Sequence, residues 1–186
     1  MSTESERCER KIRTANEMTS RQFQCTSPEH ELTVYPKWLC FVSENQYKVP
    51  QFVLFTVENR EPYPVSYHVK AREKLFRVDR PSGFLKSGER RVLRLYLVSS
   101  DDWPLALVEY SQKKLKVAVE SIRIPTWLEP MNTREASLMA RQIWKRSANE
   151  WPLERLYTKV NIHLASSLLS NKNPPPTTNV HTKIRV

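Results

Sequence analysis

One stretch in the middle of the chain decides the fold. It opens and closes with alternating runs, Val65-Ser66-Tyr67-His68-Val69-Lys70 and Arg91-Val92-Leu93-Arg94-Leu95-Tyr96-Leu97. Apolar and polar residues that alternate with a period of two indicate half-buried β-strands. Between the runs lie Val78-Asp79-Arg80-Pro81-Ser82-Gly83-Phe84-Leu85 and Ser87-Gly88-Glu89, whose Pro, Ser and Gly residues are typical of turns. The stretch therefore predicts the middle of an antiparallel β-sandwich.

The two glycines of the chain, Gly83 and Gly88, both fall in this stretch. Glycine tolerates a positive φ and allows other groups to approach the backbone closely. We expect Gly83 to supply a positive φ in a turn between two paired strands. Ser87-Gly88-Glu89 is expected to form a looser polar turn.

Further elements are predicted on both sides of the central stretch. Strands are predicted at Glu31–Tyr35, Trp38–Val42, Phe52–Glu58, Lys114–Ile122 and Leu156–Leu164. A helix is predicted over Thr133–Arg146, because apolar residues recur there at helical spacing after a capping-box-like pair. Strands without alternating helices predict an all-β fold, an immunoglobulin-like seven-stranded β-sandwich with a short helix near the C-terminus.

One domain between two flexible ends is expected. Residues 1–30 lack sustained periodicity, which predicts a flexible N-terminal arm. Residues 31–164 are predicted to form the β-sandwich. Residues 165–186 include Asn173-Pro174-Pro175-Pro176 and predict a flexible, Pro-containing tail.

The formal net charge of +10 is concentrated in the central stretch. The stretch contains nine basic residues but only three acidic ones, Glu73, Asp79 and Glu89. The nine are Lys70, Arg72, Lys74, Arg77, Arg80, Lys86, Arg90, Arg91 and Arg94. This cluster predicts a local positive potential on the central strands that captures an acidic partner segment. A solvated face without a function is an open alternative. Nucleic acid is disfavoured, because the nearby aromatic residues alternate inward and no RNA-binding signature is present.

Cysteine use and the chain start bear on the compartment. Cys8, Cys25 and Cys40 are odd in number and widely spaced, which favours reduced thiols in the cytoplasm. The N-terminus has no apolar segment behind a basic start, so no signal peptide is predicted. No apolar run approaches the roughly 18 residues that span a bilayer, so no transmembrane anchor is predicted either.

No catalytic, cofactor-binding or metal site is predicted. The histidines, His30, His68, His163 and His181, lie far apart in the sequence, and His68 and His163 fit the solvent faces of strands. Cys40 lies in an apolar run and fits a structural thiol. Two glycines cannot build a P-loop or a dinucleotide-binding fingerprint. The sequence therefore predicts a protein that is not an enzyme.

The turn Val78–Leu85 resembles the Val-Asp-Pro-Pro-Cys-Gly-Val-Leu turn of the major sperm protein (MSP) domain, which nematode major sperm proteins share with VAP proteins. Three more segments resemble this family in the same order: Asn59–Lys70, Val117–Glu120 and Arg141–Trp144. The family's Thr-Thr after the lysine is replaced here by Ala71-Arg72. The chain resembles a divergent soluble member of the family.

The resemblance implies a non-catalytic protein–protein interaction or structural module of the cytoskeletal, self-assembling type, built from a homodimer. It also implies an alternative, a soluble VAP-like adaptor that binds acidic peptide motifs through a basic strand face. Lys70 is then a partner-binding residue by its Val-Lys motif. Arg72 and Lys74 join it by proximity. No cofactor is implied.

Overall fold

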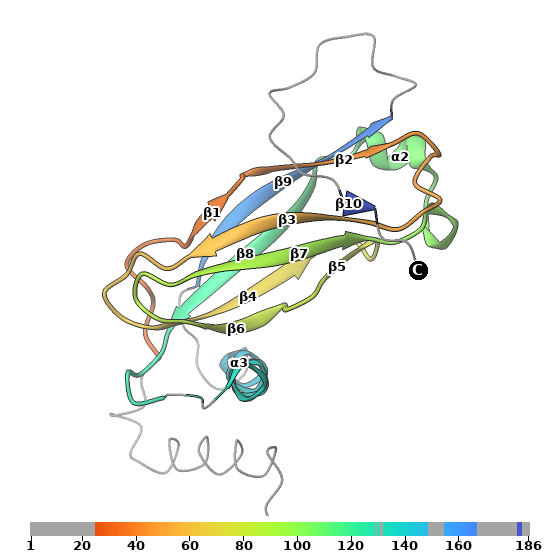
Figure 1. Ribbon diagram of the computed structural model, residues 1–186. Coiled ribbons are helices and arrows are strands. Elements are labelled where there is room, and N and C mark those ends of the chain that lie inside the picture. The colour runs from red at the N-terminus through yellow and green to blue at the C-terminus, as the bar shows by residue number, and fades with distance from the viewer. Residues whose placement is uncertain (1–24, 129, 131, 149–154, 167–181, 184–186) are drawn as a thin grey trace, which may run out of the picture.

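The computed structural model describes residues 25–128, 130, 132–148, 155–166 and 182–183. These residues form two β-sheets that pack face to face, with one long helix against an outer face (Figure 1). The predicted immunoglobulin-like β-sandwich with a helix near the C-terminus is confirmed. Each sheet has five described strands. This is more than predicted, because some strands are too short to show an alternating apolar pattern in the sequence.

The β3 sheet has the strand order β1-β3-β7-β5, and β10 also pairs with β3. Its strands are β1 Thr33–Tyr35, β3 Gln51–Glu58, β7 Arg90–Leu97, β5 Phe76–Val78 and β10 Thr182–Lys183. All pairs in this sheet are antiparallel. In Figure 1 its strands β3 and β7 lie nearest the viewer.

The β8 sheet has the strand order β2-β9-β8-β4-β6. Its strands are β2 Trp38–Ser43, β9 Leu156–Ser166, β8 Leu115–Arg123, β4 Val65–Ala71 and β6 Ser82–Leu85. The pairs made by the central stretch are antiparallel as predicted, whereas β2 pairs with β9 in parallel. After Pro36 the chain crosses from the β3 sheet to the β8 sheet, where β2 becomes an edge strand beside the last long strand.

The core lies between the sheets and follows the predicted alternation. In β3 the buried residues are Val53, Phe55 and Val57, and in β7 they are Leu93, Leu95 and Leu97. Fully burying such a side chain contributes about 1.5–3 kcal/mol. Because the apolar set has a period of two, a shift of one residue in register would expose all of it, so the core fixes the pairing.

Gly88 lies in a turn as predicted, but Gly83 does not have the role expected of it. Gly83 lies inside β6, and a Cβ there would stand 2.8 Å from both Cε1 and Oη of Tyr67 and 2.9 Å from Nη1 of Arg91. Gly88, in the β6–β7 turn, has the positive φ of 71°. The prediction of a positive φ at Gly83 is therefore wrong, and a close approach by Tyr67 and Arg91 is what requires glycine there.

Helix α3 spans Thr133–Ser147, which confirms the predicted helix. The Asn132 side chain caps it by accepting a hydrogen bond from Glu135 N at 2.8 Å. Its apolar stripe packs on the outer face of the β8 sheet and forms a second core cluster. That cluster contains Cys25, Phe84, Ile122, Ile124, Leu128, Ala136, Met139, Ala140, Ile143 and Trp144. A short helix that the sequence did not predict, α2 Leu107–Gln112, buries Tyr110.

The domain boundaries at residues 31 and 164 stay a prediction. Most of the predicted arm, residues 1–24, and residues 167–181 and 184–186 of the predicted tail lie outside the described residues. Residues 25–30 are described: Cys25 is buried, and Thr26 forms a β-bridge with Arg123. None of the described helices is long and apolar enough to cross a membrane.

Candidate partner-binding groove

The three predicted partner-binding residues lie at one end of β4. Lys70 is on the outer face of the β8 sheet, and Arg72 and Lys74 follow in the β4–β5 turn. All three side chains are exposed. Lys70 and Arg72 line a groove of about 560 Å³, whereas Lys74 does not line it.

The floor of this groove is made by the small side chain of Ala118. In the strand register Ala118 lies between Lys70 on β4 and Lys159 on β9. Opposed residues of antiparallel strands share a face, so Lys70, Ala118 and Lys159 form a row across the sheet. Lys116, two residues before Ala118 on β8, lies on the same face. We call Lys70, Arg72, Lys116 and Lys159 the basic groove.

Charge in the basic groove is of one sign. None of the described residues that line it is acidic; besides the four cations they are His68, Val69, Ala71, Val117 and Ala118. The carboxylate of Glu120 pairs with Lys70: its Oε1 lies 2.9 Å from Lys70 Nζ, and its Oε2 lies 3.9 Å from Arg155 Nη1. Glu120 is therefore shared by two cations, and the groove keeps an excess of positive charge.

His68, which lines the groove, packs against Trp144 of helix α3. The ring of His68 lies 5.4 Å from that of Trp144, and Trp144 Nε1 donates to Ser66 Oγ at 3.0 Å. His68 Nδ1 lies 2.6 Å from Ser82 Oγ. The expected solvent face for His68 is therefore wrong, because α3 covers that part of the sheet. Burial, helped by the charge of Lys70, lowers the pKa of His68 below its ordinary value, so the ring is neutral near pH 7.

The predicted single basic cluster is divided between the two sheets. Arg77, Arg90 and Arg94 belong to strands of the β3 sheet, away from the basic groove. Arg90 pairs with Glu58 at 3.1 Å, and the Arg94 guanidinium lies 5.5 Å from the ring of Phe52. The chain crosses between the two sheets after β4, which separates these arginines from Lys70. In the basic groove Lys70 is joined instead by Lys116 and Lys159, which are distant from it in the sequence.

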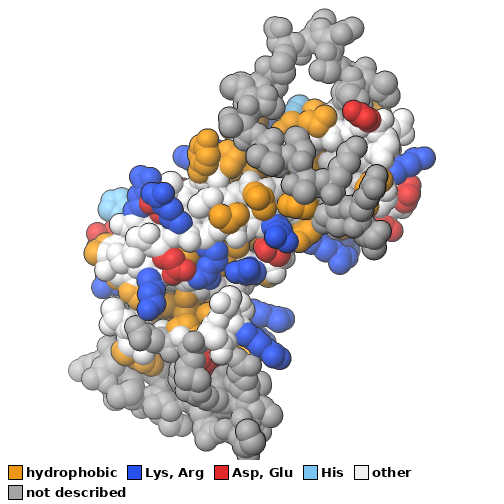
Figure 2. Space-filling model, in the orientation of Figure 1, with side chains coloured by type: hydrophobic (Ala, Val, Ile, Leu, Met, Phe, Trp, Pro, Cys, Tyr) orange, Lys and Arg blue, Asp and Glu red, His pale blue; other side chains and the backbone are white. Residues whose placement is uncertain are grey.

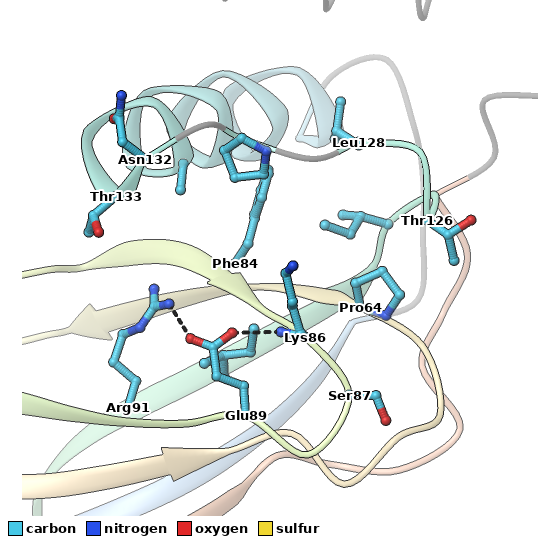
Figure 3. A pocket seen from close by; sticks show the side chains of 14 residues that line it. Pro64, Phe84, Lys86, Ser87, Glu89, Arg91, Thr126, Leu128, Asn132 and Thr133 are labelled. Atoms are coloured by element: carbon cyan, nitrogen blue, oxygen red, sulfur yellow. Dashed lines mark hydrogen bonds and ion pairs between the residues drawn. The ribbon is translucent and has the colours of Figure 1, made fainter.

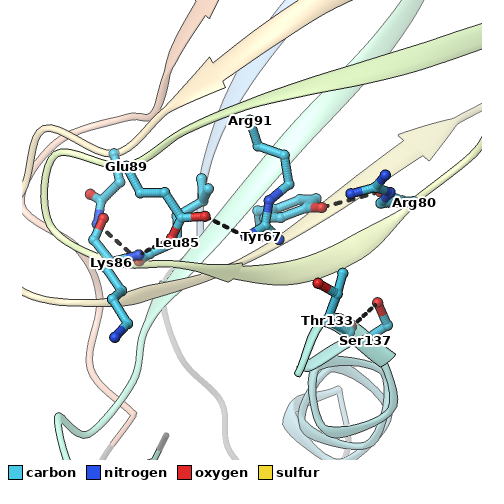
Figure 4. A network of polar contacts seen from close by, with 9 residues as sticks. Tyr67, Arg80, Leu85, Lys86, Glu89, Arg91, Thr133 and Ser137 are labelled. Carbon is cyan, nitrogen blue, oxygen red and sulfur yellow. Dashed lines mark hydrogen bonds and ion pairs between the residues drawn. The ribbon is translucent and has the colours of Figure 1, made fainter. Parts of the chain in front are cut away.

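Arg91 has a structural role between the sheets. Its guanidinium lies 5.9 Å from the centre of the Tyr67 ring and pairs with Glu89, and Tyr67 Oη donates to Arg80 O at 3.4 Å (Figure 4). Arg91 and Glu89 also line a cavity of about 370 Å³ under α3, together with Phe84 and Leu128 (Figure 3). This cavity is separate from the basic groove.

Among the described residues, one group has an arrangement that could hold a metal ion: Glu29, His30 and Glu61, with ligand atoms within 4.8 Å of one another. Glu61 is buried, and its Oε1 accepts from His30 N at 2.7 Å and lies 2.9 Å from His30 Nδ1. The buried carboxylate is thus satisfied by protein groups. The contacts attach the segment before β1 to the β3–β4 turn.

The sequence prediction missed Lys116 and Lys159, which complete the groove. Lys116 carried a signal, because the alternation of Lys114–Ile122 places it on the outer face. No local signal brings β8 and β9 next to β4, so their lysines could not be joined to Lys70 from the sequence.

Comparison with known proteins gives likenesses of fold. No family model and no curated sequence matches the chain. WR4, an MSP family member of Caenorhabditis elegans, is 11% identical with a TM-score of 0.44, over 74% of this chain and 100% of its own. SSP-19, an MSP-domain-like protein of the same nematode, is 11% identical with a TM-score of 0.47, over 71% and 99%. PapD-like domain 7 of human CEP192 is 10% identical with a TM-score of 0.41, over 73% and 84%. Solved structures similar to this chain thus include members of the MSP family, which the sequence resembles.

Proposed function

We propose that this chain is a non-catalytic protein-interaction module of the cytoplasm that binds acidic segments of partner proteins in the basic groove. The observation that carries the proposal is the row Lys70–Ala118–Lys159 with Lys116 and Arg72 beside it. Four basic residues from three strands and a turn surround Ala118, whose side chain is a single methyl group.

An acidic segment in an extended conformation fits this row. Neighbouring strands are about 4.8 Å apart, so Lys70 and Lys159, two strands apart, stand about 10 Å from each other at their backbones. In an extended peptide, side chains on one side recur about every 6.6 Å. Two or three carboxylates of one segment can therefore meet Lys70, Lys116 and Lys159 at once, while a side chain between them rests on Ala118.

The test is binding of an acidic, aromatic-containing peptide to wild type and to two charge-reversed variants. One variant carries Lys116→Glu and Lys159→Glu. The control carries Arg77→Glu and Arg94→Glu, which change the charge equally on the β3 sheet. If each exposed charge pair contributes roughly 0.5–1 kcal/mol, replacing two attractive pairs by repulsive ones should weaken binding about tenfold or more.

The control variant should bind almost as wild type does, with a small loss from the reduced net charge. Equal loss in both variants would show that only the net charge attracts the peptide, which contradicts the proposal. Lys70→Glu and Arg72→Glu should weaken binding more than Lys74→Glu, because Lys74 does not line the groove. A single-stranded oligonucleotide of matched charge is the competitor, and a preference for it over the peptide would also overturn the proposal.

Self-assembly is a second candidate function, favoured by the outer face of the β3 sheet. Tyr35, Leu54 and Val92 are 67%, 41% and 56% exposed on that face, which no described helix covers (Figure 2). Exposed apolar groups of this kind favour association. Sedimentation over a range of concentrations should reveal a concentration-dependent species that Val92→Lys removes; a monomer at all concentrations would exclude this candidate.

A further inference from the structure

Strand β6 lies at the edge of the β8 sheet, and the described strand that pairs with it is β4. Just before β6, Val69 N donates to Pro81 O at 2.7 Å, so the backbone of Pro81 faces β4. The direction of the backbone groups alternates along an antiparallel strand, and Gly83 therefore faces β4 as well. The N–H and C=O groups of Ser82 and Phe84 point the other way, where no described strand lies.

Phe84 is the edge position at which this matters most. The residue is only 6% exposed, yet within the described part of the chain its N–H and C=O have no hydrogen-bond partner. The next N–H on this side, that of Lys86, donates to Glu89 Oε2 at 2.8 Å, so the turn satisfies the edge there. Backbone groups away from water nearly always have a partner, and an N–H and a C=O side by side are what an added strand pairs with.

The cavity under α3 adjoins this edge, because Phe84 is one of its lining residues (Figure 3). Its apolar wall also includes Ile124, Leu128 and Ala136. Arg91, which belongs to the other sheet, lines it too, so the cavity reaches past β6 toward β7. A cavity of about 150 Å³ accommodates benzene, so one of about 370 Å³ has room for an apolar side chain.

We propose that the edge of β6 at Phe84 binds an extended segment of a partner protein, and that one apolar side chain of this segment enters the cavity under α3. The residue opposite Phe84 would form a hydrogen-bonded pair with it and direct its side chain to the same face of the sheet, toward α3. An extended peptide satisfies both the backbone groups and the apolar wall, whereas a purely apolar small molecule would leave the backbone groups unpaired.

The segment differs in chemistry from the acidic one proposed for the basic groove. Arg91 already pairs with Glu89, so an uncharged segment is expected here. None of the described residues that line the cavity also lines the basic groove. The inference therefore stands or falls independently of the proposed function.

The first test uses a blocked pentapeptide with leucine at its centre and threonine at the other four positions. It is titrated into the full-length chain, and the amide chemical shifts are followed by nuclear magnetic resonance. The amides of Phe84 and Ala136 should shift, and that of Gly83, which faces β4, should shift less. An N-methyl group on the leucine should weaken binding about tenfold, because it removes the N–H that donates to Phe84 O. An N-methyl group on the threonine before it should not, because that N–H points away from β6.

The second test concerns the cavity. Ala136→Leu fills the space that the peptide's leucine needs, so the variant should bind the peptide about tenfold more weakly. The matched control is Ala148→Leu, at the exposed C-terminal end of α3, which should bind as wild type does. A peptide with glycine in place of leucine tests the same contact on the unaltered protein and should also bind about tenfold more weakly. The Lys116→Glu and Lys159→Glu double variant should bind the leucine peptide normally.

Four results would overturn the proposal. Equal binding of the peptide with N-methyl-leucine would show that the edge is not used, and equal binding of the glycine peptide would show that the cavity is not used. An unchanged Phe84 amide at the highest soluble peptide concentration would show that water alone satisfies this edge. Shifts of Phe84 and Ala136 that follow the protein concentration and resist the peptide would assign the edge to a second copy of the chain.

Discussion

Replacement of Gly83 by alanine tests the close packing of β6 on Tyr67. The added Cβ would lie 2.8 Å from Cε1 and Oη of Tyr67, while ordinary contact begins at 3.4 Å. The Tyr67 ring would have to move by about 0.6 Å, the difference between these two distances. Tyr67 is fully buried and its ring is rigid, so it has little room to do so. Overpacking of this kind costs about 1–3 kcal/mol.

Gly88→Ala is the matched comparison because the physical cause differs. A Cβ at Gly88 would meet nothing within 4 Å, but its φ is +71°. The left-handed conformation costs a non-glycine residue about 1–2 kcal/mol. We therefore expect Gly83→Ala to cost about 2 kcal/mol and Gly88→Ala about 1 kcal/mol, and Gly83→Val to cost more than Gly83→Ala.

Urea unfolding followed by tryptophan fluorescence measures both costs as changes in the free energy of unfolding. Only the Gly83 variants should also change the near-ultraviolet signal of the buried tyrosines, because only there does an aromatic ring move. A Gly83→Ala variant within about 0.5 kcal/mol of wild type, where most surface substitutions fall, would refute the reasoning.

Three further predictions follow from single buried groups. The pKa of His68 is lowered in the native state, so below pH 6.5 the unfolded chain takes up a proton more readily than the native chain does. The free energy of unfolding should therefore fall as the pH drops below 6.5. His68→Phe should flatten that slope in urea titrations at different pH values. Asn59→Ala should cost about 2–3 kcal/mol in the same unfolding assay, because the buried Asn59 amide donates to Tyr63 O, Leu85 O and Lys86 O. Burial raises the pKa of the Cys25 thiol to about 12, so iodoacetamide should label Cys25 in native protein far more slowly than in urea; equal rates would contradict its burial.

Local pattern was enough to determine most of the secondary structure. The alternating runs around Tyr67 and Leu95 became β4 and β7, and the spacing of apolar residues after Asn132 became α3. These predictions held because a strand or an amphipathic helix with one buried face repeats its apolar residues with the period of its own backbone. Lys70 was placed on an exposed strand face for the same reason.

Pairing between distant segments was decided only by the tertiary structure. Lys159 joins Lys70 because β8 lies between β9 and β4, and nothing near either lysine encodes that order. Arg94 left the predicted cluster because the chain crosses to the other sheet between β4 and β7. The role of Gly83 was mispredicted for a similar reason: a positive φ is a local property of a turn, but the need for space at Gly83 comes from Tyr67 and Arg91 on other strands. Contacts of this kind are fixed by how whole faces pack, so the sequence determined which residues face outward and the fold determined which of them meet.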